Sequence, residues 1–200
     1  MNDIKVIALT GGAGAGKSFI SEILKTEFKL FVIDSDSVTK SLMEPGGAIY
    51  DGYIALLGPV ILNADYTINR AKVAEIVFND DALLKAINEI AHPATIDSIK
   101  EQIKSLKEAG EKVVFVESAI AYSSGYSDFC NEFWYVDCSE ETRRKRLKLA
   151  RNYSDEKIDA IISNQRANER SQIDADVIIE NEWNDTRESL TKKIAFHLPK

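Results

Sequence analysis

The sequence predicts an α/β fold in which helices flank a central parallel sheet, and three observations support it. Short runs rich in Val, Ile and aromatic residues alternate with longer helical patterns along the 200 residues. These short runs are apolar at successive positions, which suits strands buried on both faces, as in a parallel sheet. A glycine-rich stretch follows the first run and opens a helical pattern, at the place where open α/β sheets bind ligands.

Five short runs are the predicted strands, and each is bounded by polar or turn-forming residues. In chain order they cover residues 5–9, 30–33, 112–116, 132–136 and 177–179. Apolar residues at helical spacing predict helices over residues 17–28, 36–43, 71–78, 81–108, 139–151, 154–169 and 184–197. This alternation indicates βαβ units. The long, mainly helical stretch 36–111 is expected to be an insertion between the second and third strands.

Composition and charge exclude several classes of protein. With 44% hydrophobic and 28% charged residues, the chain is ordinary for one globular domain with a sizeable core. A net charge of −7 argues against a nucleic-acid-coating protein. The apolar run near the N-terminus is too short for a signal peptide or a membrane span, so a cytoplasmic protein without a membrane partner is expected. Cys130 and Cys138 are too few for a disulfide framework and are spaced unlike a zinc site, so buried or inert thiols are expected.

The glycine-rich stretch reads GGAGAGKS and lies between a predicted strand and a predicted helix. Its spacing, Gly11-x-x-x-x-Gly16-Lys17-Ser18, is the phosphate-binding P-loop pattern in the context that makes it credible. Glycine permits backbone angles at which successive N–H groups converge on one phosphate, and the helix N-terminus adds its own amides and dipole. The pattern assigns Lys17 to the β- and γ-phosphates and the Ser18 hydroxyl to Mg²⁺. We therefore predict a nucleoside triphosphate site; the alternative is a glycine-rich turn followed by a chance Lys-Ser pair.

A triphosphate site leaves open what receives the phosphoryl group. The Asn-Lys-x-Asp run by which a GTPase would read guanine does not occur in the sequence. A small-molecule kinase instead needs a carboxylate for the acceptor's proton, cations around the phosphoryl group and an acceptor pocket. Asp34 and Asp36 follow the second predicted strand and are candidate carboxylates, although Asp is also an ordinary helix N-cap.

The candidate cations lie in RRKRLKLAR, residues 143–151, which holds six cations and no acid. On a helix, Arg143, Arg146 and Arg151 are candidates to share a face and bind phosphate oxygens. Six like charges in nine residues repel one another unless an anion is near; the alternative is a solvated helix surface. A second helical pattern follows, so residues 139–171 are predicted to form a mobile lid.

Taken in order, several segments resemble those of dephospho-coenzyme A (dephospho-CoA) kinases from end to end. They are GGAGAGKS, IDSDSVTKSL, INRAKVAEIVF, INEIAHPATI, RRKRL, a later SNQ and ADVIIEN. The P-loop is common to many kinases, whereas the ordered set is far more specific. The resemblance implies the P-loop NTPase fold and transfer of the γ-phosphoryl group of ATP to the 3′-hydroxyl of the ribose of dephospho-CoA, the last step of coenzyme A biosynthesis.

The resemblance also implies roles for individual residues. Asp36 is the carboxylate beside the acceptor hydroxyl, and Asp34, Arg70 and His92 join it in binding the acceptor. Lys17 and Arg146 act on the transferring phosphoryl group, while Asn181 belongs to a turn near the adenine. The implied nucleotide-binding set is Gly12, Ala13, Gly14, Ala15, Gly16, Lys17, Ser18, Phe19, Arg146 and Asn181, with Ser18 as the metal ligand. Bland alternatives stay open: Asn69-Arg70 as a helix start with a solvated arginine, and Pro93 as a helix breaker.

The resemblance further implies a division of the chain and a set of small-molecule partners. It implies one P-loop kinase domain, with its core at about 1–36, 110–138 and 172–200, a helical acceptor-binding region at about 37–109 and the lid at about 139–171. ATP, Mg²⁺ and dephospho-CoA are the expected ligands, and the protein is expected to be a monomer or a small homo-oligomer.

The sequence departs from the family pattern at several positions. Phe19 stands where these kinases commonly have Thr, and Trp183 replaces the glycine of an Asn-x-Gly turn. Residues 118–122, SAIAY, replace a Pro-Leu-Leu segment that is followed by an acid, and Glu117 is the acid present instead; it either orients a metal-bound water or caps the strand. Arg151 lies one residue beyond the position of the second lid arginine, which is a helical rotation of roughly 100°.

Two other functions remain alternatives on the sequence. A P-loop kinase of another nucleoside, nucleotide or small metabolite would keep the fold and change only the acceptor pocket. A non-catalytic ATP-binding protein is favoured only by the altered segment 118–122.

Overall fold

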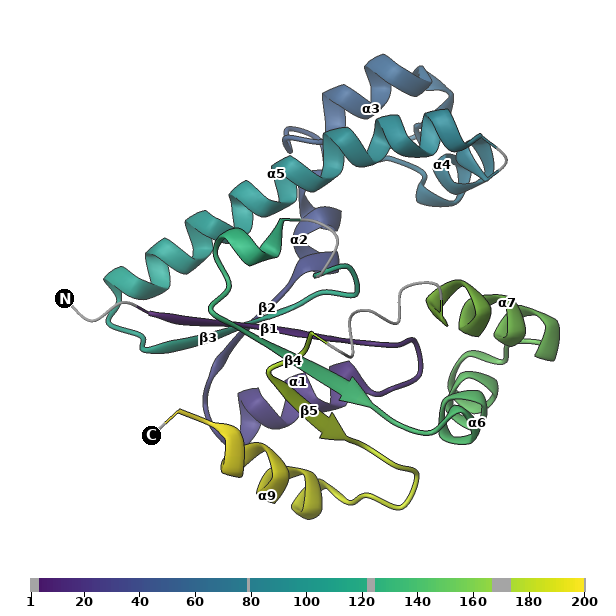
Figure 1. Cartoon of the computed structure of the whole chain (residues 1–200). Helices are drawn as coiled ribbons and strands as arrows, with labels where there is room; N and C mark the ends of the chain where they lie inside the picture. The colour runs from purple at the N-terminus through teal and green to yellow at the C-terminus, as the bar shows by residue number, and fades with distance from the viewer. Residues whose placement is uncertain (1–3, 79, 122–124, 167–173, 200) are drawn as a thin grey trace. The chain divides into compact units, whose positions relative to one another are not determined.

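The computed structural model describes residues 4–78, 80–121, 125–166 and 174–199 (Figure 1). The chain divides into two compact units. Met1–Ile33 and Lys107–Lys200 form the first, here called the sheet unit, and Asp34–Leu106 form the second, the helical unit. Among the helices described, none has the length and apolar character needed to cross a membrane.

A five-stranded sheet forms the centre of the sheet unit, with strand order β2-β3-β1-β4-β5. The strands are β1 (Lys5–Gly11), β2 (Phe31–Asp34), β3 (Val113–Glu117), β4 (Glu132–Asp137) and β5 (Val177–Glu180). β1 pairs in parallel with both β3 and β4, and β4 pairs in parallel with β5. The five predicted strands are confirmed, each ending one or two residues later than expected. The glycine-rich loop therefore leaves from the middle strand of the sheet.

The helices of the sheet unit also follow the prediction closely. They are α1 (Lys17–Thr26), α6 (Glu140–Arg151), α7 (Asp155–Arg166) and α9 (Arg187–His197), with a short 3₁₀ turn at Tyr126–Asp128. Three of them begin later than expected because a capping residue stands outside the helix. Ser139 accepts from the Thr142 N–H, Ser154 accepts from the Lys157 N–H, and Thr186 forms a capping box with Ser189. The predicted end of the helix over 154–169 lies outside the described residues.

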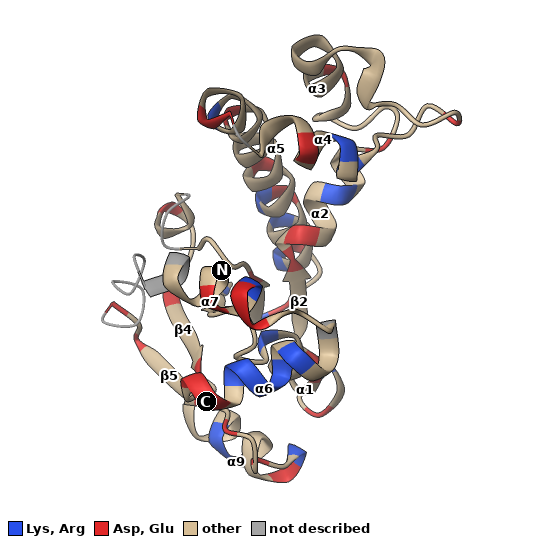
Figure 2. Cartoon of the chain, turned by 90° about the vertical axis from the view of Figure 1, so that its right-hand side faces the viewer, with Lys and Arg blue, Asp and Glu red and all other residues tan. Residues whose placement is uncertain are grey.

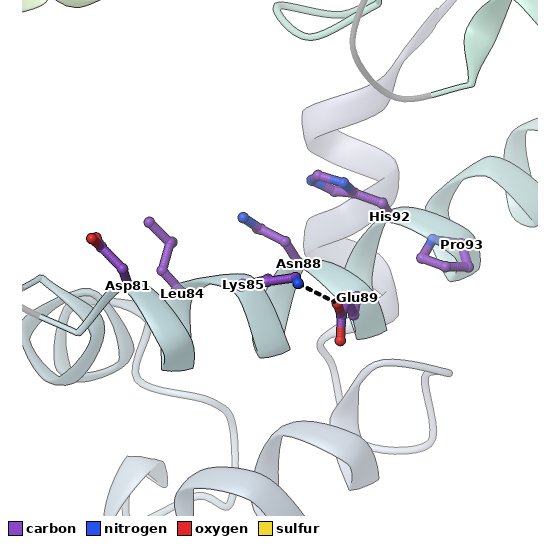
Figure 3. A pocket seen from close by; sticks show the side chains of 7 residues that line it. All are labelled: Asp81, Leu84, Lys85, Asn88, Glu89, His92 and Pro93. Carbon is purple, nitrogen blue, oxygen red and sulfur yellow. Dashed lines mark ion pairs between the residues drawn. The ribbon is translucent and has the colours of Figure 1, made fainter.

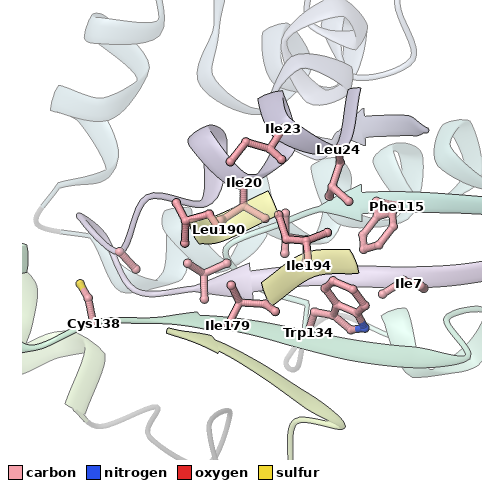
Figure 4. Packing of buried hydrophobic residues seen from close by; sticks show 13 residues of the cluster. Ile7, Ile20, Ile23, Leu24, Phe115, Trp134, Cys138, Ile179, Leu190 and Ile194 are labelled. Carbon is pink, nitrogen blue, oxygen red and sulfur yellow. The ribbon is translucent and has the colours of Figure 1, made fainter. Parts of the chain in front are cut away.

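A hydrophobic core joins α1 and α9 to the sheet (Figure 4). Ile20, Ile23 and Leu24 of α1 are fully buried, as are Leu190 and Ile194 of α9. Below them, the Phe115 ring of β3 and the Trp134 ring of β4, the strands on either side of β1, meet edge to face with centroids 5.1 Å apart. Each such side chain contributes roughly 1.5–3 kcal/mol by leaving water. The start of α1, where the P-loop ends, is thereby anchored to the sheet.

Both cysteines lie in the sheet unit, are buried and form no disulfide. Burial raises the pKa of the Cys130 thiol to about 12. Burial, opposed in part by Arg146, raises the pKa of Cys138 to about 11. Both thiols are therefore protonated at neutral pH, and the prediction of buried thiols is confirmed.

The helical unit consists of α2 (Ser35–Leu42), α3 (Tyr50–Leu57), a 3₁₀ turn (Pro59–Ile61), α4 (Arg70–Val77) and most of α5 (Asp81–Glu108). Its core is a cluster that includes Ile49, Tyr53, Ile61, Val73 and Ile87. Helical periodicity in the sequence predicts α2, α4 and α5 but not α3. That helix has only two turns and contains a glycine, so its periodicity is weak. Tertiary packing stabilises it instead: Tyr53 is buried in the core of the helical unit, and Ile54 and Leu57 pack against that core.

Pro93 lies inside α5, which runs unbroken from Asp81 to Glu108. The alternative that Pro93 breaks the helix is therefore wrong. Proline removes one backbone hydrogen bond, but the residues on either side pack on one buried face, including Ala91 and Thr95. The Thr95 and Thr39 hydroxyl oxygens, 2.9 Å apart, add a hydrogen bond between α5 and α2. Packing thus outweighs the local cost of the proline.

Candidate active site

The P-loop runs from the end of β1 to the start of α1 and needs glycine for two physical reasons. Gly14 and Gly16 have φ of +81° and +94°, in the left-handed region that side chains avoid. A Cβ on Gly11 would lie 2.3 Å from the Val136 carbonyl oxygen on the adjacent strand. The loop is therefore shaped by its own backbone angles and by the closeness of β4.

Cationic side chains bind carbonyl oxygens at the start of the loop. Lys17 Nζ donates to the Gly11 carbonyl at 2.8 Å, and Arg143 Nε donates to the Ala13 carbonyl at 3.1 Å. The Arg143 guanidinium also packs on Gly12, where an added Cβ would lie 2.8 Å from its Cζ. In a planar trans peptide the N–H and the C=O point in opposite directions. Hydrogen bonds that fix these carbonyl oxygens therefore also orient the N–H groups toward the opposite face of the loop, where a phosphate would bind.

Arg146 and Asn181 bind the last turn of the loop. Arg146 Nη1 donates to the Ala15 carbonyl at 3.0 Å and lies 3.4 Å from that of Gly14. The buried Asn181 side chain donates through Nδ2 to the same Ala15 oxygen at 2.8 Å, and its Oδ1 accepts from Arg146 Nη2 at 3.1 Å. Asn181 thus reaches the loop directly, a contact that the sequence did not predict.

Four of the six cations of 143–151 divide between two partners, the P-loop and acids of α7, and Figure 2 shows Lys and Arg along α6. Arg143 and Arg146 share the face that contacts the P-loop, as predicted. Arg144 instead pairs with Glu140 at 2.9 Å and with Asp159 of α7 at 2.6 Å. Lys148 pairs with Asp155 at 3.0 Å. Acids of α7 therefore neutralise part of the positive charge of this run, so repulsion among its cations does not by itself require a bound anion. The Arg151 side chain lies outside the described residues.

Apolar contacts hold α6, α7 and the P-loop together. Leu147 of α6 packs with Ile158 and Ile162 of α7, and all three are buried. Ala13 of the loop packs against this cluster. The segment predicted to be a lid therefore contacts the loop in this structure; its mobility stays a prediction.

Glu117, the last residue of β3, lies within hydrogen-bond distance of the hydroxyl assigned to a metal. Ser18 Oγ donates to Glu117 Oε1 at 3.2 Å, and Ser21 Oγ donates to Oε2 at 2.6 Å. The register that pairs Leu9 with Glu117 sets this position, because it places Glu117 within two residues of the end of β1. Among the described residues, no group of three or more His, Cys, Asp or Glu side chains could hold a metal ion. A hydroxyl and a carboxylate nevertheless fit Mg²⁺, which takes few protein ligands when phosphates supply others.

Phe19 and Trp183, which both depart from the family pattern, contact other side chains in the structure. The Phe19 side chain packs against the core, and the Arg187 guanidinium carbon lies 5.3 Å from its ring centre. Trp183 is exposed, and Lys145 Nζ lies 3.9 Å from the centre of its ring. In the altered segment, buried Ser118 accepts from the Ile120 N–H, while Tyr122 lies outside the described residues.

The candidate acceptor residues belong to the helical unit. Asp34 caps α2, since its carboxylate accepts from the Asp36 N–H at 3.0 Å and from the Ser37 hydroxyl at 2.6 Å. The N-cap interpretation is therefore correct for Asp34. Asp36 lies in the first turn of α2 with an exposed side chain, whose carboxylate has no hydrogen bond or ion pair to any described residue. The two acids consequently differ in structural role.

Arg70 and His92 occupy separate helices of that unit. Arg70 is the first residue of α4, exposed, after an N-cap in which Asn69 accepts from the Lys72 N–H. His92 lines a groove of about 530 Å³ along α5. Figure 3 shows Asp81, Leu84, Asn88 and His92 along one face of this helix, as spacings of three and four residues require. The helix-start interpretation of Asn69-Arg70 is correct structurally, and the acceptor-binding roles stay predictions.

The strand–loop–helix geometry defines this chain as a P-loop NTPase-fold protein. A family model for dephospho-CoA kinase matches residues 5–186. The chain is 36% identical over 159 residues to the dephospho-CoA kinase of Lactobacillus johnsonii, covering 80% of each, and 33% identical over 178 residues to that of Carboxydothermus hydrogenoformans, covering 89% and 86%. The solved dephospho-CoA kinase from Campylobacter jejuni has the same fold, with a TM-score of 0.69, 24% identity and 95% of both chains covered. The chain belongs to the dephospho-CoA kinase family.

Replacing Gly16 by Ala is expected to weaken MgATP binding about tenfold or more. The left-handed φ costs roughly 1–2 kcal/mol for a residue with a Cβ. The loop escapes this cost by leaving the conformation that presents its amides, so MgATP binding has to restore that conformation, and each 1.4 kcal/mol is about a factor of ten in affinity. The new Cβ would also lie 2.3 Å from Asn181 Nδ2, which would displace that amide from the loop. Titration calorimetry with MgATP measures the affinity.

Gly110→Ala is the matched control, because Gly110 has nearly the same φ, +92°, and its added Cβ would meet no atom within 4 Å. It should lose comparable folding stability and keep its MgATP affinity. Equal loss of affinity in both variants would contradict the importance of the loop geometry.

Proposed function

We propose that this chain transfers the γ-phosphoryl group of ATP to the 3′-hydroxyl of the ribose of dephospho-CoA, giving coenzyme A and ADP. The main observation in support is a P-loop whose carbonyl oxygens accept hydrogen bonds from Lys17, Arg143 and Arg146. The chain that contains this loop belongs to the dephospho-CoA kinase family. Phosphoryl transfer requires little covalent chemistry from a protein, so positioning and electrostatic stabilisation account for most of the catalysis.

On the nucleotide side, the loop amides and the N-terminus of α1 bind the phosphates, and Lys17 reaches the β- and γ-phosphates. Ser18 and Glu117 are the residues that would hold Mg²⁺, which when bound neutralises phosphate charge. Arg146 is bound to neutral carbonyl and amide oxygens. A phosphate oxygen is a stronger partner for a guanidinium, so Arg146 can exchange part of this set for the transferring group.

On the acceptor side, Asp36 accepts or orients the proton of the attacking hydroxyl. The Asp36 carboxylate is exposed and has no hydrogen bond to another described residue, whereas the Asp34 oxygens cap α2. This difference supports Asp36, and not Asp34, as the proton acceptor. Arg70 provides a cation for the acceptor's phosphates, and His92 with its groove on α5 contributes to binding the rest of the molecule.

Acceptor-dependent ADP formation is the direct test. Purified protein with MgATP should release ADP rapidly only when dephospho-CoA is present, and the product should gain the mass of one phosphoryl group. A panel of nucleosides and nucleotides at the same concentration serves as the control. MgATP binding without turnover of dephospho-CoA would contradict the proposed acceptor, and faster turnover of a panel member would replace it.

Asp36→Asn is expected to lower kcat by about 10²-fold or more while leaving the KM for ATP nearly unchanged, because only proton acceptance is lost. The matched variant Asp34→Ala should instead destabilise the fold by roughly 0.5–2 kcal/mol, the usual cost of an N-cap. Steady-state kinetics and urea unfolding measure the two effects. An unfolded Asp36→Asn protein without a separate kinetic defect would mean that Asp36 is structural.

Glu117→Gln is expected to raise the Mg²⁺ concentration needed for half-maximal activity and to leave metal-free ATP binding unchanged. The amide retains one hydrogen-bond acceptor for the serine hydroxyls but loses the charge that favours a divalent cation. Glu180→Gln, at the end of β5, is the control because it removes an exposed acid from another strand end. Identical Mg²⁺ dependence in Glu117→Gln and the unmodified protein would exclude Glu117 from the metal site.

A further inference from the structure

The turn after β5 contains a carboxylate, Glu182, that accepts three hydrogen bonds. Glu182 Oε1 accepts from the Ser139 N–H at 2.6 Å. Its Oε2 accepts from the Ser139 hydroxyl at 2.9 Å and from the Thr142 hydroxyl at 2.6 Å. Ser139 is the N-cap of α6, so this one side chain binds the first turn of the helix that carries Arg146.

The backbone of the same residue binds α6 again, two turns further along. Arg146 Nη2 donates to the Glu182 carbonyl at 3.1 Å. Ser139 and Arg146 are seven residues apart, which is close to two helical turns, so both contacts lie on one face. Two contacts at this spacing restrict both the rotation of α6 about its axis and its shift along the axis.

Arg146 then connects this helix to the P-loop. Its Nη1 donates to the Ala15 carbonyl, and Asn181, next to Glu182, donates to the same oxygen. A helix that rotated or slid would withdraw the guanidinium from Ala15. The Glu182 contacts therefore determine whether Arg146 can remain on the loop.

We propose that Glu182 is a positioning residue for phosphoryl transfer: by binding Ser139 and Thr142 it holds α6 in the orientation that keeps Arg146 on the P-loop. This inference rests on the proposed function. Glu182 touches none of the reacting groups and acts through Arg146.

The chemistry of the site explains why a carboxylate is required. The Thr142 hydroxyl and then the Ser139 N–H hold the pKa of Glu182 below its ordinary value, so it is ionised at neutral pH. A negative group at a helix N-terminus is also stabilised by the helix dipole. Glutamine has the same size but offers one oxygen for these donors, and its amide group would face one of them.

A double-mutant cycle tests the proposal. Glu182→Gln should lower kcat/KM for MgATP about tenfold, because small misplacements of catalytic groups are costly. In an Arg146→Ala background the same substitution should change kcat/KM by less than about twofold, since the residue through which it acts is gone. Glu188→Gln is the matched control, an exposed acid of α9 paired with Lys192, and should leave the activity unchanged. An equal loss in both backgrounds would overturn the proposal, because a merely structural defect is independent of Arg146.

Two further measurements keep the proposal separable from the proposed function. MgATP affinity by calorimetry needs no acceptor, so the cycle can be repeated on binding if dephospho-CoA is not turned over; failure of the acceptor and failure of the Glu182 coupling are then distinct results. If Glu182→Gln does not fold, Thr142→Val removes one donor to the carboxylate and should give a smaller loss that also depends on Arg146. A loss of equal size with and without Arg146 would again overturn the inference.

Discussion

The carbonyl oxygens of Ala13 and Ala15 in the P-loop are bound by side chains from distant parts of the chain, and the candidate site depends on this. A loop that presents its amides to a phosphate must direct its carbonyls elsewhere, and buried carbonyls need donors. Arg143, Arg146 and Asn181 supply them. The loop is consequently preorganised before a nucleotide arrives, which lowers the cost of binding.

Three separate parts of the chain have to meet for this arrangement to form. β1 lies between β3 and β4, so one neighbour brings Glu117 to Ser18 and the other places Val136 against Gly11. β5 and its turn bring Asn181 to the same end of the sheet. The parallel order explains this meeting, since parallel strands all end at one edge. Packing of α1 and α9 on the sheet then makes the edge rigid.

Sequence reasoning was most accurate where a local pattern has a single explanation. The five strands, the P-loop and the sharing of a face by Arg143 and Arg146 were all predicted. It was least accurate where contacts with residues distant in the sequence determine whether a helix forms or continues. The helix α3 was missed because its stability comes from packing, and Pro93 was allowed as a helix breaker because the burial that keeps α5 continuous is not visible in the sequence.

By itself, the sequence determined the class of the protein, because glycine spacing, strand-like runs and the ordered motifs are properties of short segments. Only the tertiary structure decided which acid meets Ser18, how the cations of α6 divide between loop and α7, and that Glu182 binds α6 at two points. These contacts join residues in different elements, from 15 positions apart for Arg144 and Asp159 to 99 for Ser18 and Glu117. Local propensity carries no information about such pairs; they follow from strand order and core packing.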